Sequence, residues 1–291
     1  MRARFDQFAK QMTRAALQRG GSVHTDQEVS PDAGHVDVWF TPANPRAPDS
    51  LSELGLLGRI ARTACTFEPF HRTPDGTDIT ACVAKHHYFR ALLDRRNEPL
   101  PLQWIVSSGR PQTALAGLRF EPTQEWGAGI YEAPPLLATH LIVVAELPET
   151  RDTLLLRLMG AGPVLARAIA DLKRLQPTEP EPTLALPVLL RLRLEIPADP
   201  MNRSQEDEEF AVTTQDIVDT YLEQTRQQGR ERGLAEAVLR LYEKRFGAPP
   251  PEIVAIIQST HDPDQLLAWM DVVDEGSVEE VRSALRGHAA S

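Results

Sequence analysis

The sequence predicts an α/β protein in which a mixed β-sheet is flanked by helices and followed by an all-α C-terminal extension. The first observation is the order of apolar patterns up to about residue 146, which is helix, strand, strand, strand, helix, strand. The second is the change after Pro148, where helical spacing replaces strand alternation. The third is the length of 291 residues, which accommodates about two domains. Strands and helices in this order form a sheet covered by helices.

The N-terminal half supplies the sheet. Gly20 and Gly21 end an amphipathic first helix, and the turn-forming run at 30–34 predicts a hairpin between the first two strands. Asp78 is expected to cap a second long helix, and the Gly- and Pro-rich region 108–138 to form loops or an extra hairpin. In chain order, the expected elements are a helix at 3–19, strands at 22–29 and 35–41, a short helix at 51–60, a strand at 64–70, a helix at 79–96, and strands at 102–107 and 139–146.

The C-terminal half supplies helices. Gly160 and Gly162 are expected to split a helical stretch into two helices. The polar, acidic run 197–209 predicts a mobile linker. The expected helices are 153–175, 184–194, 214–246, 251–259, 263–273 and 277–285. We therefore expect three parts: a sheet domain at 1–176, a helical segment with an acidic linker at 177–213, and a helical domain at 214–291. Apolar positions of the last domain predict a small bundle core or a homodimer interface.

The net charge of −10 disfavours nucleic-acid binding by the chain as a whole, but the charge is uneven. Residues 1–120 are close to balanced and residues 121–291 carry most of the excess acid, so a polyanion is expected to bind in the N-terminal half. With only Cys65 and Cys82, neither a disulfide framework nor a cysteine-rich zinc site is expected. There is no apolar run of membrane-spanning length and no signal-peptide pattern. These features predict a cytoplasmic protein without a membrane partner.

Two acidic residues lie within otherwise apolar strand patterns. Asp37 lies between Val36 and Val38, and Glu68 lies in the strand ACTFEPF about thirty residues later. A carboxylate in a buried strand is costly unless it is paired, hydrogen-bonded or bound to a metal. Two such carboxylates on neighbouring strands would make an oxygen site suited to Mg²⁺, or to Mn²⁺. The metal would neutralise a phosphodiester and activate a water as the nucleophile.

The element order and these two acids resemble the PD-(D/E)XK nuclease superfamily, and more closely its recombination-promoting nuclease/transposase group. The stretches that carry the resemblance are RFDQFAKQM, EVSPDAGHVDVWF, LGLLGRIARTACTFEPF, WGAGIYEAP, HLIVVAELPETRDTLLLRLMGAG and YEKRFG, which together span most of the chain. The resemblance implies a restriction-endonuclease-like sheet in residues 1–176. It also implies a Mg²⁺-dependent DNA endonuclease whose metal is held by Asp37 and Glu68.

The sequence departs from the family pattern at the third catalytic position. The residue two after the metal-binding Glu is usually Lys or Gln and positions the attacking water, whereas here it is Phe70. The resemblance therefore implies a substitute, which could be Lys85 on the next helix, or His71 or Arg72 just after the strand. Glu28 on the preceding strand could add a third carboxylate. The helical acid that often assists such nucleases has no evident counterpart.

Structural interpretations of the same residues stay open. Asp37 could be an acid at the hairpin edge that is satisfied by a backbone turn, and Glu68 could form an ion pair with Arg59, Arg62 or Arg72. A second function hypothesis, supported mainly by Phe70 in place of the water-positioning Lys, is a catalytically decayed nuclease-fold scaffold that binds protein or nucleic acid without cleavage. A nuclease toxin or defence component would share the chemistry of the first hypothesis. A serine hydrolase is disfavoured because the GxSxG motif is missing.

Overall fold

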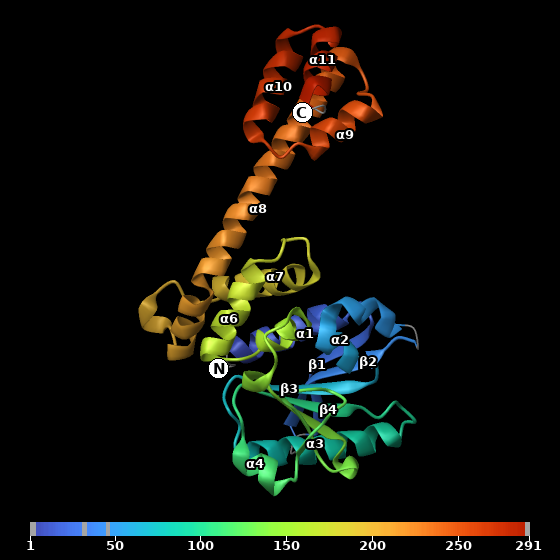
Figure 1. Ribbon diagram of the computed structural model, residues 1–291, viewed down its shortest axis with the longest axis vertical. Coiled ribbons are helices and arrows are strands. Elements are labelled where there is room, and N and C mark those ends of the chain that lie inside the picture. The colour runs from blue at the N-terminus through green and yellow to red at the C-terminus, as the bar shows by residue number, and fades with distance from the viewer. Residues whose placement is uncertain (1–3, 31–33, 45–46, 289–291) are drawn as a thin grey trace. The chain divides into compact units, whose positions relative to one another are not determined.

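The computed structural model describes residues 4–30, 34–44 and 47–288 and contains one seven-stranded mixed sheet (Figure 1). The strand order is β1-β2-β3-β4-β7-β6-β5. The elements of the sheet region are α1 (Arg4–Leu17), β1 (Gly21–Ser30), β2 (Gly34–Pro42), η1 (Ala47–Leu54), α2 (Gly55–Ile60), β3 (Cys65–Phe70), α3 (Gly76–Asp94), β4 (Leu102–Ser107), α4 (Gln112–Gly117), β5 (Glu121–Pro122), β6 (Ile130–Glu132) and β7 (Thr139–Val143). The predicted α/β class with a mixed, helix-flanked sheet is confirmed.

The sheet combines an antiparallel and a parallel half. β1, β2 and β3 are antiparallel neighbours, whereas β3, β4 and β7 run parallel to one another. A parallel neighbour requires a crossover, and α3 supplies the one between β3 and β4. In Figure 1, α3 and α4 lie on one side of the sheet, and α1 and α2 lie on the other. The end of the β2–β3 pair therefore lies between two helices that belong to opposite layers.

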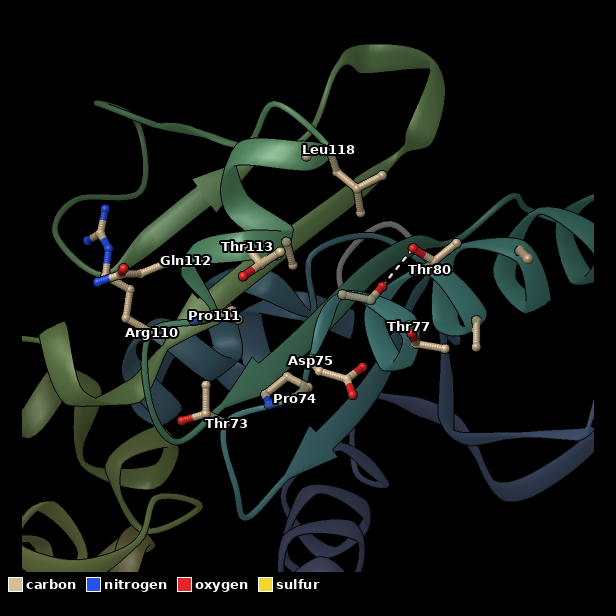
Figure 2. Close-up of a pocket in the computed structure, with 15 residues that line it drawn as sticks. Thr73, Pro74, Asp75, Thr77, Thr80, Arg110, Pro111, Gln112, Thr113 and Leu118 are labelled. Atoms are coloured by element: carbon tan, nitrogen blue, oxygen red, sulfur yellow. Dashed lines mark hydrogen bonds between the residues drawn. The ribbon is translucent and has the colours of Figure 1, made fainter.

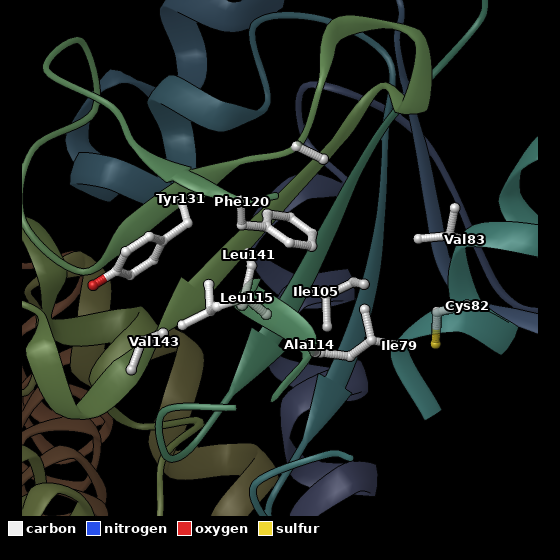
Figure 3. Close-up of a cluster of buried hydrophobic side chains, with 11 residues drawn as sticks. Ile79, Cys82, Val83, Ile105, Ala114, Leu115, Phe120, Tyr131, Leu141 and Val143 are labelled. Atoms are coloured by element: carbon white, nitrogen blue, oxygen red, sulfur yellow. The ribbon is translucent and has the colours of Figure 1, made fainter. Parts of the chain in front are cut away.

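The crossover helix is fixed to the sheet by an apolar cluster (Figure 3). Ile79 and Cys82 of α3 pack against Ile105 of β4 and Leu141 of β7, and Leu115 of α4 closes the cluster. Apolar burial of this kind contributes about 25 cal/mol for each Å² removed from water. The cluster holds α3 in one position along the sheet, and this position sets where the polar residues of α3 lie.

Two details of the sheet region differ from the sequence-based expectations. The long helix begins at Gly76, earlier than expected, because Asp75 is the N-cap residue and Asp78 completes a capping box with it. The Gly- and Pro-rich region contains the helix α4 as well as the expected hairpin, which is formed by β5 and β6. The predicted turn between β1 and β2 falls on residues 31–33, which lie outside the described residues.

The helical half contains α5 (Leu154–Arg157), α6 (Gly162–Lys173), α7 (Pro180–Leu194), η5 (Pro200–Asn202), α8 (Gln205–Phe246), α9 (Pro251–Ser259), α10 (Pro263–Glu275) and α11 (Val278–His288). The predicted break between α5 and α6 is confirmed. Nowhere in the described ranges is a helix long and apolar enough to cross a membrane.

The chain forms two compact units, 1–218 and 219–291, so its division differs from the boundaries expected at 176 and 213. The expected acidic linker 197–209 contains η5 and the first turn of α8. Asp207 of this segment and Phe210 just after it pack on α1: Arg4 Nε lies 2.7 Å from Asp207 Oδ1, and the rings of Phe5 and Phe210 lie 5.0 Å apart. The sheet and the whole of α7 therefore belong to one unit.

The second unit has its own apolar core. Tyr242 of α8, Ile253 of α9, Trp269 of α10 and Leu285 of α11 are buried in one cluster. Each helix buries its apolar face against the others, which agrees with the small bundle core expected from the sequence.

Candidate active site

Asp37 and Glu68 occupy facing positions on neighbouring strands. In the antiparallel β2–β3 pair, Val38 is opposite Phe67 and Trp39 is opposite Thr66. One further step of this register places Asp37 opposite Glu68, and opposite residues in an antiparallel pair have their Cβ atoms about 5 Å apart. The backbone N–H of Asp37 also donates a hydrogen bond to the carboxylate of Glu68. The two carboxyl groups therefore lie close enough to affect each other electrostatically.

Glu68 is buried and its charge is compensated from α3. Its exposed fraction is 3%, and Lys85 Nζ lies 2.8 Å from Oε1 and 2.8 Å from Oε2. The same ammonium donates to the carbonyl oxygen of His35 on β2, at 2.7 Å. Burial, together with the charge of Asp37, raises the pKa of Glu68 to about 7, although Lys85 opposes this shift. Near neutral pH, this carboxyl group exists in both protonation states.

Asp37 is compensated from the other helical layer. Lys10 Nζ of α1 lies 2.5 Å from Asp37 Oδ1 and 3.1 Å from Asp26 Oδ1. Burial lowers the pKa of Lys10, but the charge of Asp37 and hydrogen bonds to both aspartates outweigh burial and raise it above its usual value. Lys10 is therefore a permanent cation beside the carboxyl pair. Asp26 has a left-handed backbone conformation with φ of 52° in the middle of β1.

Asp6 is a third acidic side chain near the pair, and the sequence reasoning missed it. It lies on α1 one turn before Lys10, and its Oδ1 accepts a hydrogen bond of 3.4 Å from the N–H of His71. Burial raises the pKa of Asp6 to about 6, and the charge of Asp37 contributes to the shift. The i, i+4 spacing of Asp6 and Lys10 puts both residues on one helix face, and this spacing was the signal in the sequence.

Three residues were considered as substitutes for the usual Lys or Gln at the position of Phe70. Of these, Lys85 is the one whose side chain contacts Glu68. His71 stacks on Phe5 with 3.7 Å between ring centroids, and Arg72 Nη1 pairs with Asp78 Oδ2 at 2.7 Å. Neither residue contacts Glu68. Phe70, at the usual Lys or Gln position, packs against the apolar cluster beneath α3.

The remaining candidates are not at the site. Glu28 is exposed and pairs through its backbone with His35, while Asp26 takes the place near Lys10 expected of a third strand acid. The arginine partners considered for Glu68 lie elsewhere, and Arg59 covers the ring of Trp126. The ion pair that Glu68 forms is with Lys85.

The donor atoms can hold a hard divalent cation only with help from water or substrate. Among the described residues, no group of three or more His, Cys, Asp or Glu side chains could hold a metal ion. Mg²⁺ is commonly held by one or two carboxylates, with waters and substrate phosphates completing the shell. Asp37 and Glu68 fit this donor set. In the structure the two lysine ammonium groups provide the positive charge that the carboxylates require.

A pocket of about 1070 Å³ lies between the start of α3 and α4 (Figure 2). Neither Asp37 nor Glu68 lines it. Its charged lining residues among those described are Asp75 and Arg110, and both are engaged. Asp75 accepts a hydrogen bond of 2.8 Å from Asp78 N, and Arg110 Nη1 lies 2.6 Å from Glu146 Oε1. The remaining lining is largely Thr, Ala, Gly and Pro, so this pocket lacks acid–base chemistry.

No protein-family model, curated protein or solved structure matches this chain. The resemblance described above therefore rests on the residues of this sequence and on the order of its elements.

Proposed function

We propose that this protein is a divalent-metal-dependent nuclease of the PD-(D/E)XK type that hydrolyses phosphodiester bonds in DNA. The observation that carries the proposal is the carboxyl pair Asp37 and Glu68 on facing positions of β2 and β3, with Lys85 Nζ 2.8 Å from Glu68. Two carboxylates and an ammonium group in this arrangement are the charges that metal-assisted hydrolysis of a phosphodiester uses. DNA as the substrate follows from the resemblance of the sequence.

Each residue has a role in this proposal. Asp37 and Glu68 would hold Mg²⁺ or Mn²⁺, which when bound supplies positive charge and acidifies a water molecule. Lys85 would orient that water or stabilise the charge that develops on the phosphate. Lys85 can do so although Phe70 occupies the usual position, because α3 brings the ammonium group to Glu68 from another element.

The test is nicking of supercoiled plasmid by the purified full-length chain in Mg²⁺ or Mn²⁺. Asp37→Asn and Glu68→Gln are expected to lower the rate about 100-fold or more, since each removes a metal ligand that contributes several kcal/mol to transition-state stabilisation. Glu28→Gln is the matched control, because Glu28 is an exposed acid of the same hairpin. Its rate should stay within about threefold of the wild type, as expected for a surface substitution.

A second candidate function is a nuclease-fold scaffold that binds DNA or protein without cleaving it. The observation that favours it is the compensation of both carboxyl groups by lysines, as in a purely structural ion-pair network. Wild-type protein that leaves plasmid DNA intact in both metals, yet still binds DNA, would support the scaffold and exclude the nuclease.

A further inference from the structure

A cationic groove of about 750 Å³ lies between α1, β1 and α7, all within the first unit. Its lining includes Lys10 and Arg14 of α1 and Arg191 of α7, and Asp26 of β1 is the acidic residue among the described lining. Three cations against one acid give the lining residues a formal charge of +2, and Asp37, which also pairs with Lys10, lowers the local charge to about +1 at neutral pH, although the chain as a whole carries −10. A concave surface with charge opposite to that of the whole molecule attracts a polyanion locally.

The two arginines lack acidic partners within the described part of the chain. Arg14 and Arg191 are both exposed, and Arg191 donates to the side-chain oxygen of Gln11, which is uncharged. By contrast, Arg4, Arg72 and Arg151 of the same unit each pair with a carboxylate. Guanidinium groups without carboxylates keep their planar donor forks free, and this geometry matches phosphate oxygens.

Lys10 connects the groove to the carboxyl pair. Lys10 lines it, and Lys10 Nζ is 2.5 Å from Asp37 Oδ1. Arg14 and Gln18 also line the groove, so with Lys10 they form a row with a residue at every fourth position along one face of α1 and just past its C-terminal end. At 1.5 Å per residue this row is about 12 Å long, and a nucleic-acid strand with a phosphate every 3.4 Å would place about three to four phosphates along it.

We infer that this groove binds the phosphodiester backbone of a nucleic-acid strand through Arg14 and Arg191 and directs the strand to Asp37 and Glu68. The inference deepens the proposed nuclease function and rests on it for the destination of the strand. The binding itself does not require a metal.

The test is the affinity of the full-length protein for fluorescein-labelled DNA, single-stranded and duplex, measured by anisotropy in EDTA from 50 to 200 mM salt. We expect the double variant Arg14→Gln/Arg191→Gln to bind at least one of the two DNA forms about tenfold more weakly or worse. The slope of log K against log salt should fall by about 1 to 2, because up to two phosphate contacts are lost.

The control is Arg226→Gln/Arg240→Gln, which removes the same charge from exposed positions of α8 outside the groove. Equal affinities and salt slopes for the two double variants would overturn the inference.

Asp37→Asn should retain DNA binding in EDTA. If the wild type cleaves DNA but its DNA affinity does not depend on Arg14 and Arg191, the proposed role of the groove is refuted and the proposed nuclease function is not. If DNA binding depends on Arg14 and Arg191 but the wild type does not cleave DNA, the proposed nuclease function is refuted.

Discussion

At the scale of single residues, the site depends on how the buried carboxyl group of Glu68 tolerates the partly exposed carboxyl group of Asp37. Glu68 is almost completely buried next to Asp37, and both effects disfavour its negative charge. Lys85 offsets this cost by contacting both oxygens of Glu68, and Lys10 contacts Oδ1 of Asp37 from the opposite layer. In the proposed function, a metal that displaced either lysine would bind a carboxylate that the fold already holds at the site.

Lys85 is expected to keep the pKa of Glu68 from rising further. Lys85→Met removes the ammonium group but preserves most of the volume, so the remaining burial and the charge of Asp37 should raise the pKa of Glu68 above its wild-type value of about 7. The measurement is an NMR titration of the ¹³C-labelled Glu68 carboxyl group in both proteins. An unchanged or lower midpoint in Lys85→Met would show that Lys85 does not stabilise the ionised form.

Asp6 should make the stability of the protein depend on pH. Its pKa is about 6 in the folded state and near 3.8 when unfolded, so the folded state binds more protons between these values. The stabilising effect of the protonated group is fully present below pH 3.8 and is lost as pH rises through 6. Asp6→Asn should therefore gain stability relative to the wild type on going from pH 4 to pH 7. We expect about 1 to 2 kcal/mol after allowance for solvent screening.

The measurement for Asp6 is urea unfolding of both proteins at several pH values. Contributions from other groups largely cancel in the difference, because the two proteins share those groups. A difference that stays constant between pH 4 and pH 7 would contradict the assigned burial of Asp6.

The sequence predicted part of this constellation. Asp37 and Glu68 were identifiable because charged residues interrupt apolar strand patterns, and Lys85 because it lies on the helix that follows. Lys10 was placed on the helix face where an assisting acid would lie, but Asp6 was not singled out, because an acid on an amphipathic helix normally faces solvent. Only the packing of α1 against the end of β2 shows that their shared face points to Asp37.

At the scale of elements, the crossover helix α3 and the long helix α8 differ in how firmly they are held. α3 begins with a reciprocal capping box between Asp75 and Asp78 and buries an apolar face in the cluster beneath it. The middle of α8 is exposed, and Gly229 and Gly233 weaken its intrinsic helix stability. Helix boundaries were predicted less well than helix positions, since the capping residue of α3 was expected at Asp78.

Replacement of the glycines in α8 should stabilise this helix. A methyl group at Gly229 or Gly233 would meet no atom within 4 Å, so each substitution by Ala should contribute about 0.5 to 1 kcal/mol. Limited trypsin digestion of the wild type is expected to cut near Arg226, Arg230 and Arg232, where α8 is exposed. Gly229→Ala/Gly233→Ala should slow this cleavage several-fold.

Gly247→Ala is the contrasting control for α8. Gly247 ends the helix with φ of 82°, a backbone conformation that penalises alanine. This variant should lower the thermal stability of the helical bundle, whereas the double variant should not. Equal trypsin cleavage rates for the double variant and the wild type would refute the assignment of this segment as a marginal helix.

At the scale of the whole molecule, the sequence predicted the α/β class and the helical C-terminal part but not the boundary between the units. The acidic run 197–209 had the composition of a linker. It is ordered because Asp207 pairs with Arg4 and Phe210 packs against Phe5, which are residues about 200 positions away in the chain. Such long-range partners leave no periodic signal, so composition alone indicated a separate linker part and not a segment that packs on α1.

The chain is acidic as a whole, but the groove lined by Lys10, Arg14 and Arg191 is positively charged. An acidic protein was expected to bind a polyanion, if at all, through its more balanced N-terminal half. The cationic groove is lined by residues of α1, which belongs to that half, and also by Arg191 of α7. The contribution of α7 depends on tertiary packing, which sequence spacing did not reveal.

Calorimetric titration of the metal-free protein with Mn²⁺ at pH 8 tests whether Asp37 and Glu68 together hold a divalent cation, as we propose. We expect about one ion per chain in the wild type and in Glu28→Gln, and none in Glu68→Gln. Binding should weaken about tenfold at pH 6, because Glu68 must lose its proton to bind the metal. A wild type that binds no Mn²⁺, or a Glu68→Gln variant that binds it equally well, would contradict the claim.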